Sequence, residues 1–290
     1  IFGSRKNMGL ELSASYSEIR NDFGLFQINQ GYPVTYTTFR NIDFATITGF
    51  RGNFNIRDIG PMTISASYML QFADGTGSNI SSQQALIASN QPNLRTVIPL
   101  GDLDIRHNMK LSATWAWAGG KDPRTRKNLY NGPVLWGKEI FKFTSINVIA
   151  NTYSGGPYTP TVRAVQIGAV DRAQIKGRPF GARLPWQYNF DLNFTKGVQI
   201  NRENAKNPLV FNVFLWVNNV LNTWNVLGVF PFTGEPNDDG FLNSPQGQLL
   251  VKTQVDAQSY NDLYRLLLNS QTGNWTGPRT IRLGVRFNLN

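Results

Sequence analysis

The stretch "MTISASYMLQFAD" (residues 62–74) decides the fold, because it alternates between two kinds of side chain. Every second position is mostly apolar: Met62, Ile64, Ala66, Tyr68, Leu70 and Phe72. The positions between them are mostly small and polar: Thr63, Ser65, Ser67, Met69, Gln71 and Ala73. Successive side chains of a strand point to opposite faces, so the pattern predicts a two-faced strand. A soluble sandwich would turn the apolar face inward, whereas a membrane barrel would turn it outward to lipid.

The amino-acid composition excludes several structural and functional classes for this chain. The 290 residues contain no cysteine and a single histidine, His107, which excludes disulfides and thiolate chemistry and leaves little material for acid–base catalysis. We therefore expect no enzyme, no metal site and no cofactor. No apolar run reaches the about 18 residues of a membrane helix, whereas barrel strands leave only a weak hydropathy signal. The net charge is +10, but no long basic run stands out, so we expect no nucleic-acid partner.

The two-faced pattern recurs along the chain and predicts about eight strands. Besides the opening stretch, the segments that carry it are residues 9–17, 50–57, 108–117, 144–152, 187–195, 209–218 and 280–290. The strands are expected to run about 9–13 residues, near the length of tilted membrane strands. One short loop helix is expected at residues 258–270, where Tyr260, Leu263, Tyr264 and Leu267 approach helical spacing.

The connections between these strands are unequal. The third and fourth strands are joined tightly by "DIGP" (residues 58–61), whereas residues 75–103, 155–184 and 219–277 form long connections. In chain order the connections alternate between long and short or medium, with a basic medium turn at residues 119–138. Long loops at one end and short turns at the other are typical of an outer-membrane barrel. The pattern therefore favours an all-β, antiparallel up-and-down transmembrane barrel over a soluble sandwich.

In a membrane barrel, the apolar face of the sheet contacts lipid and the polar face lines the lumen. We predict that lipid, or the interfacial ring of aromatic side chains, contacts Tyr68, Leu70, Phe72, Leu111, Trp115, Trp117, Phe190, Phe194 and Phe287. We predict that a water-filled lumen contains Arg51, Asn53, Lys110, Asp191, Arg282 and Arg286. The pattern does not decide between a girdle and a ligand-stacking position for Trp186 and Trp216.

Several segments resemble a known family. "DIRHNMKLSATW" (104–115), "SGGPYTP" (154–160), "LPWQYNFDLNFTKGV" (184–198) and "FNVFLWVNNVLNTWN" (211–225) follow in the order of the late barrel strands of TonB-dependent outer-membrane receptors. The ending is similar to the Oar-like branch, whose members carry an N-terminal carboxypeptidase-regulatory-like domain. It comprises "TGEPNDDGFLNSPQGQ" (233–248), "YNDLYRLLLN" (260–269) and "GPRTIRLGVRFNLN" (277–290).

The resemblance implies a barrel of about 22 strands preceded by a plug domain. Residues 1–290 would form the C-terminal segment of that barrel, with the plug, the TonB-contacting segment and the regulatory-like domain upstream of Ile1. An even strand count and a long last connection would bring the final strand down to the periplasm. Such barrels usually end on an aromatic residue, and Phe287 stands three residues before the end, so we expect further residues there as well.

The resemblance also implies a place and partners. The chain would lie in the outer membrane of a Gram-negative bacterium, in contact with outer-membrane lipid and coupled to TonB through the missing upstream segments. Long extracellular loops would capture a large or scarce substrate for uptake. A surface lipoprotein or another assembly partner is also possible in such a receptor.

Candidate reactive residues have plain structural interpretations. Asp104, Arg106 and His107 could form an acid–base or ligand-contacting cluster, but hydrogen bonding where a loop re-enters a strand explains them better. "EPNDDG" (235–240) lacks the spacing of an EF-hand and favours an Asx-type turn over a calcium site. "SGGPYTP" favours the end of a strand over a ligand-contacting loop.

Two other functions stay open beside the transporter. A receptor-like barrel could serve as a structural component of an outer-membrane assembly without transport. A soluble all-β carbohydrate-binding module would need no detergent for solubility.

Overall fold

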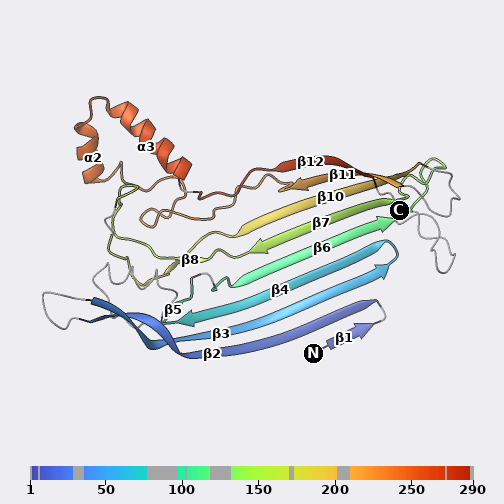
Figure 1. Ribbon diagram of the computed structural model, residues 1–290, viewed down its shortest axis with the longest axis horizontal. Coiled ribbons are helices and arrows are strands. Elements are labelled where there is room, and N and C mark those ends of the chain that lie inside the picture. Colours follow the sequence, from blue (N-terminus) through green and yellow to red (C-terminus); the bar gives the residue numbers. More distant parts are fainter. Residues whose placement is uncertain are drawn as a thin grey trace.

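A computed structural model describes residues 2–5, 7–28, 36–76, 97–101, 103–117, 132–169, 173–200, 210–271 and 273–287. Ten of the described strands form one antiparallel sheet in the order β1-β2-β3-β4-β6-β7-β10-β11-β12, with β5 paired to β4 (Figure 1). Their bounds are β1 Phe2–Arg5, β2 Met8–Ile28, β3 Tyr36–Ile59, β4 Met62–Gly75, β5 Ile98–Pro99, β6 His107–Trp117, β7 Thr144–Tyr153, β10 Gln187–Gln199, β11 Val210–Asn218 and β12 Thr280–Phe287. β8 (Pro157–Tyr158) and β9 (Ala182–Arg183) form a separate pair.

The protein is therefore all-β with up-and-down antiparallel neighbours, as predicted. Each of the eight segments that alternate in sequence is a strand: β2, β3, β4, β6, β7, β10, β11 and β12. Alternation works here because the period of two is local and every long strand pairs with the next one along the chain.

The two ends of the sheet differ. At one end, called here the turn end, β3 and β4 are joined at Gly60 and Pro61, and Gly60 has φ +63°, which glycine adopts without steric cost. The tight "DIGP" turn is thus confirmed. At the opposite end, called the loop end, lie the described parts of the long connections and the two helices of the described residues (Figure 1). Most of the basic turn predicted at residues 119–138 lies outside the described residues.

The first two long strands differ from the prediction. β2 has 21 residues and β3 has 24, against the 9–13 expected, and both extend into the connection expected between residues 17 and 50. The pairing of the two strands shifts register around Ile19, Asp22 and Phe23 and then resumes up to Ile28 and Tyr36. β3 starts "YTTF" and continues "FATIT", which is rich in β-branched and aromatic residues and suits a hairpin that continues beyond the other strands.

Two helices occupy the last long connection. α3 (Ala257–Gln271) confirms the helix predicted at residues 258–270, whereas α2 (Pro245–Lys252) was not predicted. Ser244 caps α2 by accepting a hydrogen bond from the Gly247 backbone N–H at 3.0 Å, and Pro245 stands in the first turn. No helix in the described parts of the chain is long and apolar enough to cross a membrane.

Strand register joins the apolar positions into continuous rows. One row crosses all eight long strands, each residue paired with the next: Met8, Ile56, Ile64, Ala113, Val148, Leu192, Val217 and Ile281. By contrast, the two clusters of buried apolar residues among the described residues lie toward the loop end. One surrounds Tyr264 and Leu268, and the other joins Ala45, Ala73 and Leu100.

Candidate functional site at the loop end

The register sorts the predicted lipid-facing and lumen-facing residues onto opposite faces of the sheet. Leu111 pairs with Ala66 and Ala150, whereas its neighbour Lys110 pairs with Ser67 and Asn151. The same parity places Tyr68, Leu70, Phe72, Trp115, Trp117, Phe190, Phe194 and Phe287 with Leu111. It places Arg51, Asn53, Asp191, Arg282 and Arg286 with Lys110. Their contact with lipid or with a water-filled lumen stays a prediction.

The tryptophans lie on both faces. Trp115 pairs with Met62 and Ile146 near the turn end, and Trp117 lies next to the Phe141 ring with centroids 5.0 Å apart. Trp216 lies on the polar face, where it pairs with Arg282 and its ring lies 4.8 Å from that of Phe214. Trp186 stacks on His107, as described below. Trp186 and Trp216 thus lie in different surroundings, and the choice between a girdle and a ligand-stacking position stays open for both.

His107 lies within an aromatic stack. Its ring is 6.2 Å from Tyr68 and 5.3 Å from Trp186, centroid to centroid, and is nearly parallel to both. The Tyr68 hydroxyl is 2.9 Å from His107 Nδ1. The His107 ring therefore has a stacking partner on each side and a hydrogen bond with Tyr68.

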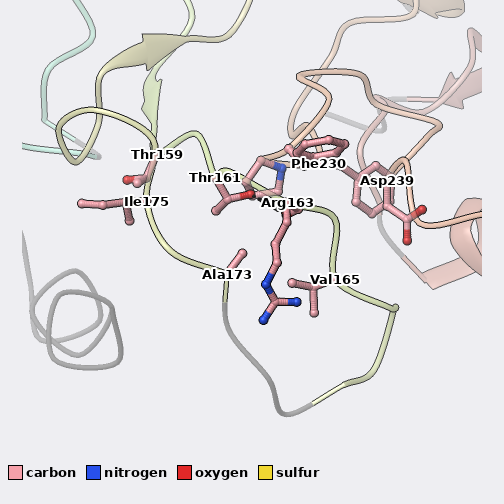
Figure 2. Close-up of a pocket in the computed structure, with 10 residues that line it drawn as sticks. Thr159, Thr161, Arg163, Val165, Ala173, Ile175, Phe230 and Asp239 are labelled. Carbon is pink, nitrogen blue, oxygen red and sulfur yellow. Dashed lines mark hydrogen bonds between the residues drawn. The ribbon is translucent and has the colours of Figure 1, made fainter. Parts of the chain in front are cut away.

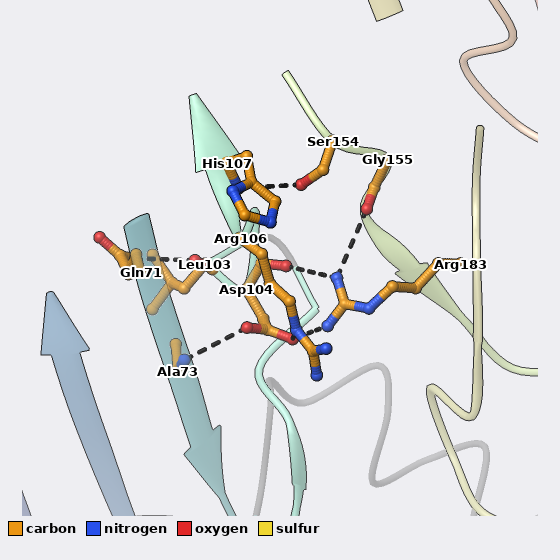
Figure 3. A network of polar contacts seen from close by, with 9 residues as sticks. All are labelled: Gln71, Ala73, Leu103, Asp104, Arg106, His107, Ser154, Gly155 and Arg183. Carbon is orange, nitrogen blue, oxygen red and sulfur yellow. Dashed lines mark hydrogen bonds and ion pairs between the residues drawn. The ribbon is translucent and has the colours of Figure 1, made fainter. Parts of the chain in front are cut away.

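Asp104 is the centre of a polar network (Figure 3). Its side chain is 1% exposed, and its Oδ2 forms an ion pair with Nη2 of Arg183. Its Oδ1 accepts a hydrogen bond from the Ala73 backbone N–H at 3.3 Å, while Arg183 Nη1 donates to the Asp104 carbonyl at 2.9 Å. Arg106 Nε lies 3.9 Å from Asp104 Oδ2. The network ties β4 and β9 to the segment that enters β6.

A second set of contacts joins the start of β6 to the end of β7. The His107 backbone N–H donates to Ser154 Oγ at 3.0 Å (Figure 3). β7 ends at Tyr153, directly before the "SGGPYTP" segment, as predicted. A Cβ on Gly155 would lie 1.9 Å from the Leu184 carbonyl oxygen, so only glycine permits this close approach of the two backbones. The Asp104, Arg106 and His107 cluster is thus the hydrogen-bonded loop re-entry that the sequence favoured.

Described parts of the connections at residues 155–184 and 219–277 form a small folded lobe, called the loop lobe, around α2 and α3. Its core consists of Ala164, Phe241, Leu242, Tyr264 and Leu268. The Tyr264 hydroxyl donates to Asp239 Oδ2 at 2.6 Å and accepts from the Ile167 backbone N–H at 3.1 Å. Burial and the Asp239 carboxylate raise the pKa of the Tyr264 phenol, because both disfavour the phenolate.

The acidic "EPNDDG" segment is part of this lobe. The carboxylates of Asp238 and Asp239 accept hydrogen bonds from the backbone N–H groups of Gly240 and Phe241, at 2.8 and 2.9 Å. These bonds span two residues, which confirms the predicted Asx-type turn. The other oxygen of Asp239 is bound by Tyr264, so the turn and the lobe core share one carboxylate.

A cavity of about 300 Å³ opens between two walls of the lobe (Figure 2). One wall is the segment around Thr161 and Val165, which is bonded to residues 174–176, and the other is formed by residues 230–232. The Thr161 N–H donates to the Pro231 carbonyl at 3.0 Å and joins the walls. Most of the lining is apolar, with Arg163 and Asp239 contributing charged groups. Such a cavity can hold a small apolar group with one polar end.

Sequence reasoning missed Arg183, the Tyr264–Asp239 pair and this cavity. No motif surrounds Arg183, which lies 79 residues from its partner Asp104. The one available signal was Tyr264, since it stands on the apolar face of the predicted helix.

Comparisons with known proteins give little beyond this. No family model matches the chain, and no curated protein matches it. Among solved structures, the outer membrane transporter YddB from Escherichia coli is similar, with a TM-score of 0.44 and 11% sequence identity. The similarity covers 78% of the present chain and 28% of the YddB chain, so the present chain spans under a third of that protein. At this TM-score and identity we draw no functional conclusion from the likeness.

Proposed function

We propose that the chain forms part of the wall of an outer-membrane receptor and transporter barrel. The observation that carries this proposal is the apolar face of the sheet, which continues across all eight long strands. Many of its large side chains are exposed, as Leu111 is at 42% and Leu283 at 74%, and neither buried cluster of the described residues covers it. A soluble protein rarely leaves so large an apolar patch in contact with water. Lipid is the solvent that suits it.

The height of the apolar face agrees with a bilayer. From Met62 to Phe72 the face spans ten residue steps of β4, or about 34 Å along the strand. A tilt of about 45° reduces this to about 24 Å across the membrane, close to the roughly 25 Å apolar band of outer-membrane barrels. The opposite face carries the charged side chains of Lys110, Asp191, Arg282 and Arg286, which suits a hydrated lumen.

The loop end would face the outside of the cell. Outer-membrane barrels keep short turns on the periplasmic side and long loops outside. The loop lobe, with its cavity, would then be the surface that meets the substrate. The polar network around Asp104 would hold the lobe on the strand ends, so that capture occurs on a fixed surface.

The proposal includes TonB coupling and membership of the Oar-like branch, and the sequence resemblance is what supports both. In such a receptor a plug upstream of these residues closes the lumen, and TonB displaces the plug. Further strands would pair with β1 and β12, because lipid requires every backbone N–H and C=O group to be bonded around a closed ring. The chain itself would act as a fixed wall, and transport would depend on the plug and the loops.

An uptake experiment tests the function. Cells that lack the gene, and cells that lack TonB, are compared during growth on scarce nutrients supplied one at a time. We expect both strains to lose growth on the same nutrient and to regain it when the missing gene is restored. Growth on every nutrient at the wild-type rate without the gene would contradict the transport function.

A structural role in an outer-membrane assembly is the second candidate, and one observation favours it. The helices of the loop lobe expose apolar side chains, with Leu263 at 55% and Leu266 at 64%. Exposed apolar residues of this kind suit a surface lipoprotein or another fixed partner. Purification of the receptor from native membranes distinguishes the roles: a stoichiometric partner together with unimpaired uptake in the deletion strain favours assembly.

A further inference from the structure

A second cleft lies between α3 and the two chain segments that flank β11 and β12. It has a volume of about 560 Å³ and is lined by Trp224, Asn237, Asn269 and Trp275. Trp224 follows β11, Trp275 precedes β12, and Asn269 is on α3. The cleft shares no lining residue with the cavity of Figure 2.

The two indole rings form a corner. Their centroids are 6.5 Å apart and their planes meet at 75°. Trp224 is 56% exposed, a large apolar surface without cover from the described residues. The Trp275 indole N–H donates to Asn237 Oδ1 at 2.6 Å, which fixes both the ring and the amide. One flat ring therefore stands open beside a second ring at nearly a right angle.

Backbone bonds hold this corner in place. Trp275 pairs with Val226 in a short bridge, and the Leu227 N–H donates to the Asn274 carbonyl at 2.7 Å. The Asn274 side chain in turn donates to the Pro236 carbonyl at 2.9 Å, next to Asn237. A site whose rings are fixed before the ligand arrives loses less conformational entropy on binding.

The lining also specifies the chemistry of an occupant. The four lining residues are two indoles and two amides, and none is charged. The bond with Trp275 uses the oxygen of the Asn237 amide and leaves its NH₂ group, and the Asn269 amide has no hydrogen-bond partner among the described residues. An occupant should therefore combine a flat apolar face with neutral hydroxyl groups at its edge.

A pyranose ring has this combination, because its C–H groups form an apolar face and its hydroxyls both donate and accept. We propose that this cleft binds a neutral saccharide, stacked on Trp224 and hydrogen-bonded by Asn237 and Asn269. The inference rests on the proposed receptor function for its place on the cell surface. It names a substrate class for the loop end. The alternative is that Trp224 contacts the lipid interface, where tryptophans are also enriched.

Saccharide binding is measured on the full-length protein in an amine-oxide detergent, since maltoside and glucoside detergents would occupy the cleft. Neutral hexasaccharides of α- and β-linked glucose, mannose and galactose are titrated while tryptophan fluorescence and heat of binding are recorded. We expect at least one to bind saturably. Trp224→Ala should weaken its affinity by about tenfold or more, and Asn269→Ala by a smaller factor.

A matched control is Trp136→Ala. Trp136 is 92% exposed and stands near the turn end, so this variant should bind as wild type does. Equal affinity in Trp224→Ala and wild type would overturn the inference, as would no saturable binding across the panel. Strong quenching of the Trp224 emission by brominated lipid in vesicles would also overturn it, because the ring would then lie in lipid. Since the readout is binding, a failed uptake assay would refute the receptor function without touching this result.

Discussion

A charge placed on the apolar face tests what covers that face. In β6, Leu111 lies four residues from both Trp115 and His107, and thus midway along the apolar band. Arginine at the middle of the lipid face of an outer-membrane barrel costs about 2–4 kcal/mol. If water covered the face, the same substitution at a side chain that is 42% exposed would change stability by only about 0.5 kcal/mol. We therefore expect Leu111→Arg to lower the free energy of unfolding by about 2–4 kcal/mol.

The assay is urea unfolding of the full-length protein in phospholipid vesicles, followed by tryptophan fluorescence and by the heat-dependent shift on gels. Ser112→Arg is the matched control, because Ser112 is the next residue and lies on the opposite face. It loses one hydrogen bond, from Asn147 Nδ2 at 3.2 Å, and should cost about 1 kcal/mol or less. Equal costs for the two variants, or no cost for Leu111→Arg, would refute the assignment of the faces.

Three further predictions concern the loop and turn ends. Asp104→Ala leaves the partly buried guanidinium of Arg183 without its partner and should lower the free energy of unfolding by about 1–3 kcal/mol. Faster hydrogen exchange of the Ala73 backbone N–H, which donates a hydrogen bond to Asp104, would report the loss. Tyr264→Phe removes the bond to Asp239 and should cost about 1–3 kcal/mol. Since folding raises the Tyr264 pKa, wild type should lose lobe stability as the pH rises above about 10, and the variant should lack this loss in exchange measurements. Gly60→Ala, at φ +63°, should cost about 1 kcal/mol in urea unfolding, whereas no loss would exclude backbone strain there.

The sequence predicted the strands well because their signal is local. Alternation over ten residues is visible without any knowledge of the partner strand, and the tight turn before Met62 carries its own glycine and proline. The length of the hairpin formed by β2 and β3 was missed, since polar residues such as Asp22 and Asn41 interrupt the alternation there. Pairing between the two strands, which is a tertiary effect, maintains the extended structure.

The candidate site was predicted only in part, because its contacts join distant residues. Asp104 was singled out, but its partner Arg183 lies in a loop strand of two residues that no pattern reveals. The Asx-type turn at residues 238–241 was predicted because its hydrogen bonds are local. The use of the same carboxylate by Tyr264, 25 residues away, depends on how α3 packs.

The most direct test of the account measures which solvent touches the apolar face. The chain contains no cysteine, so single cysteines at Leu70, Leu111 and Phe190 can each carry one spin label, with Lys110 as the label on the opposite face. In vesicles, we expect the first three labels to relax with oxygen dissolved in lipid and to ignore a water-borne nickel chelate, and the fourth to do the reverse. Labels at Leu70, Leu111 and Phe190 that respond to the chelate and not to oxygen would contradict a lipid-facing sheet.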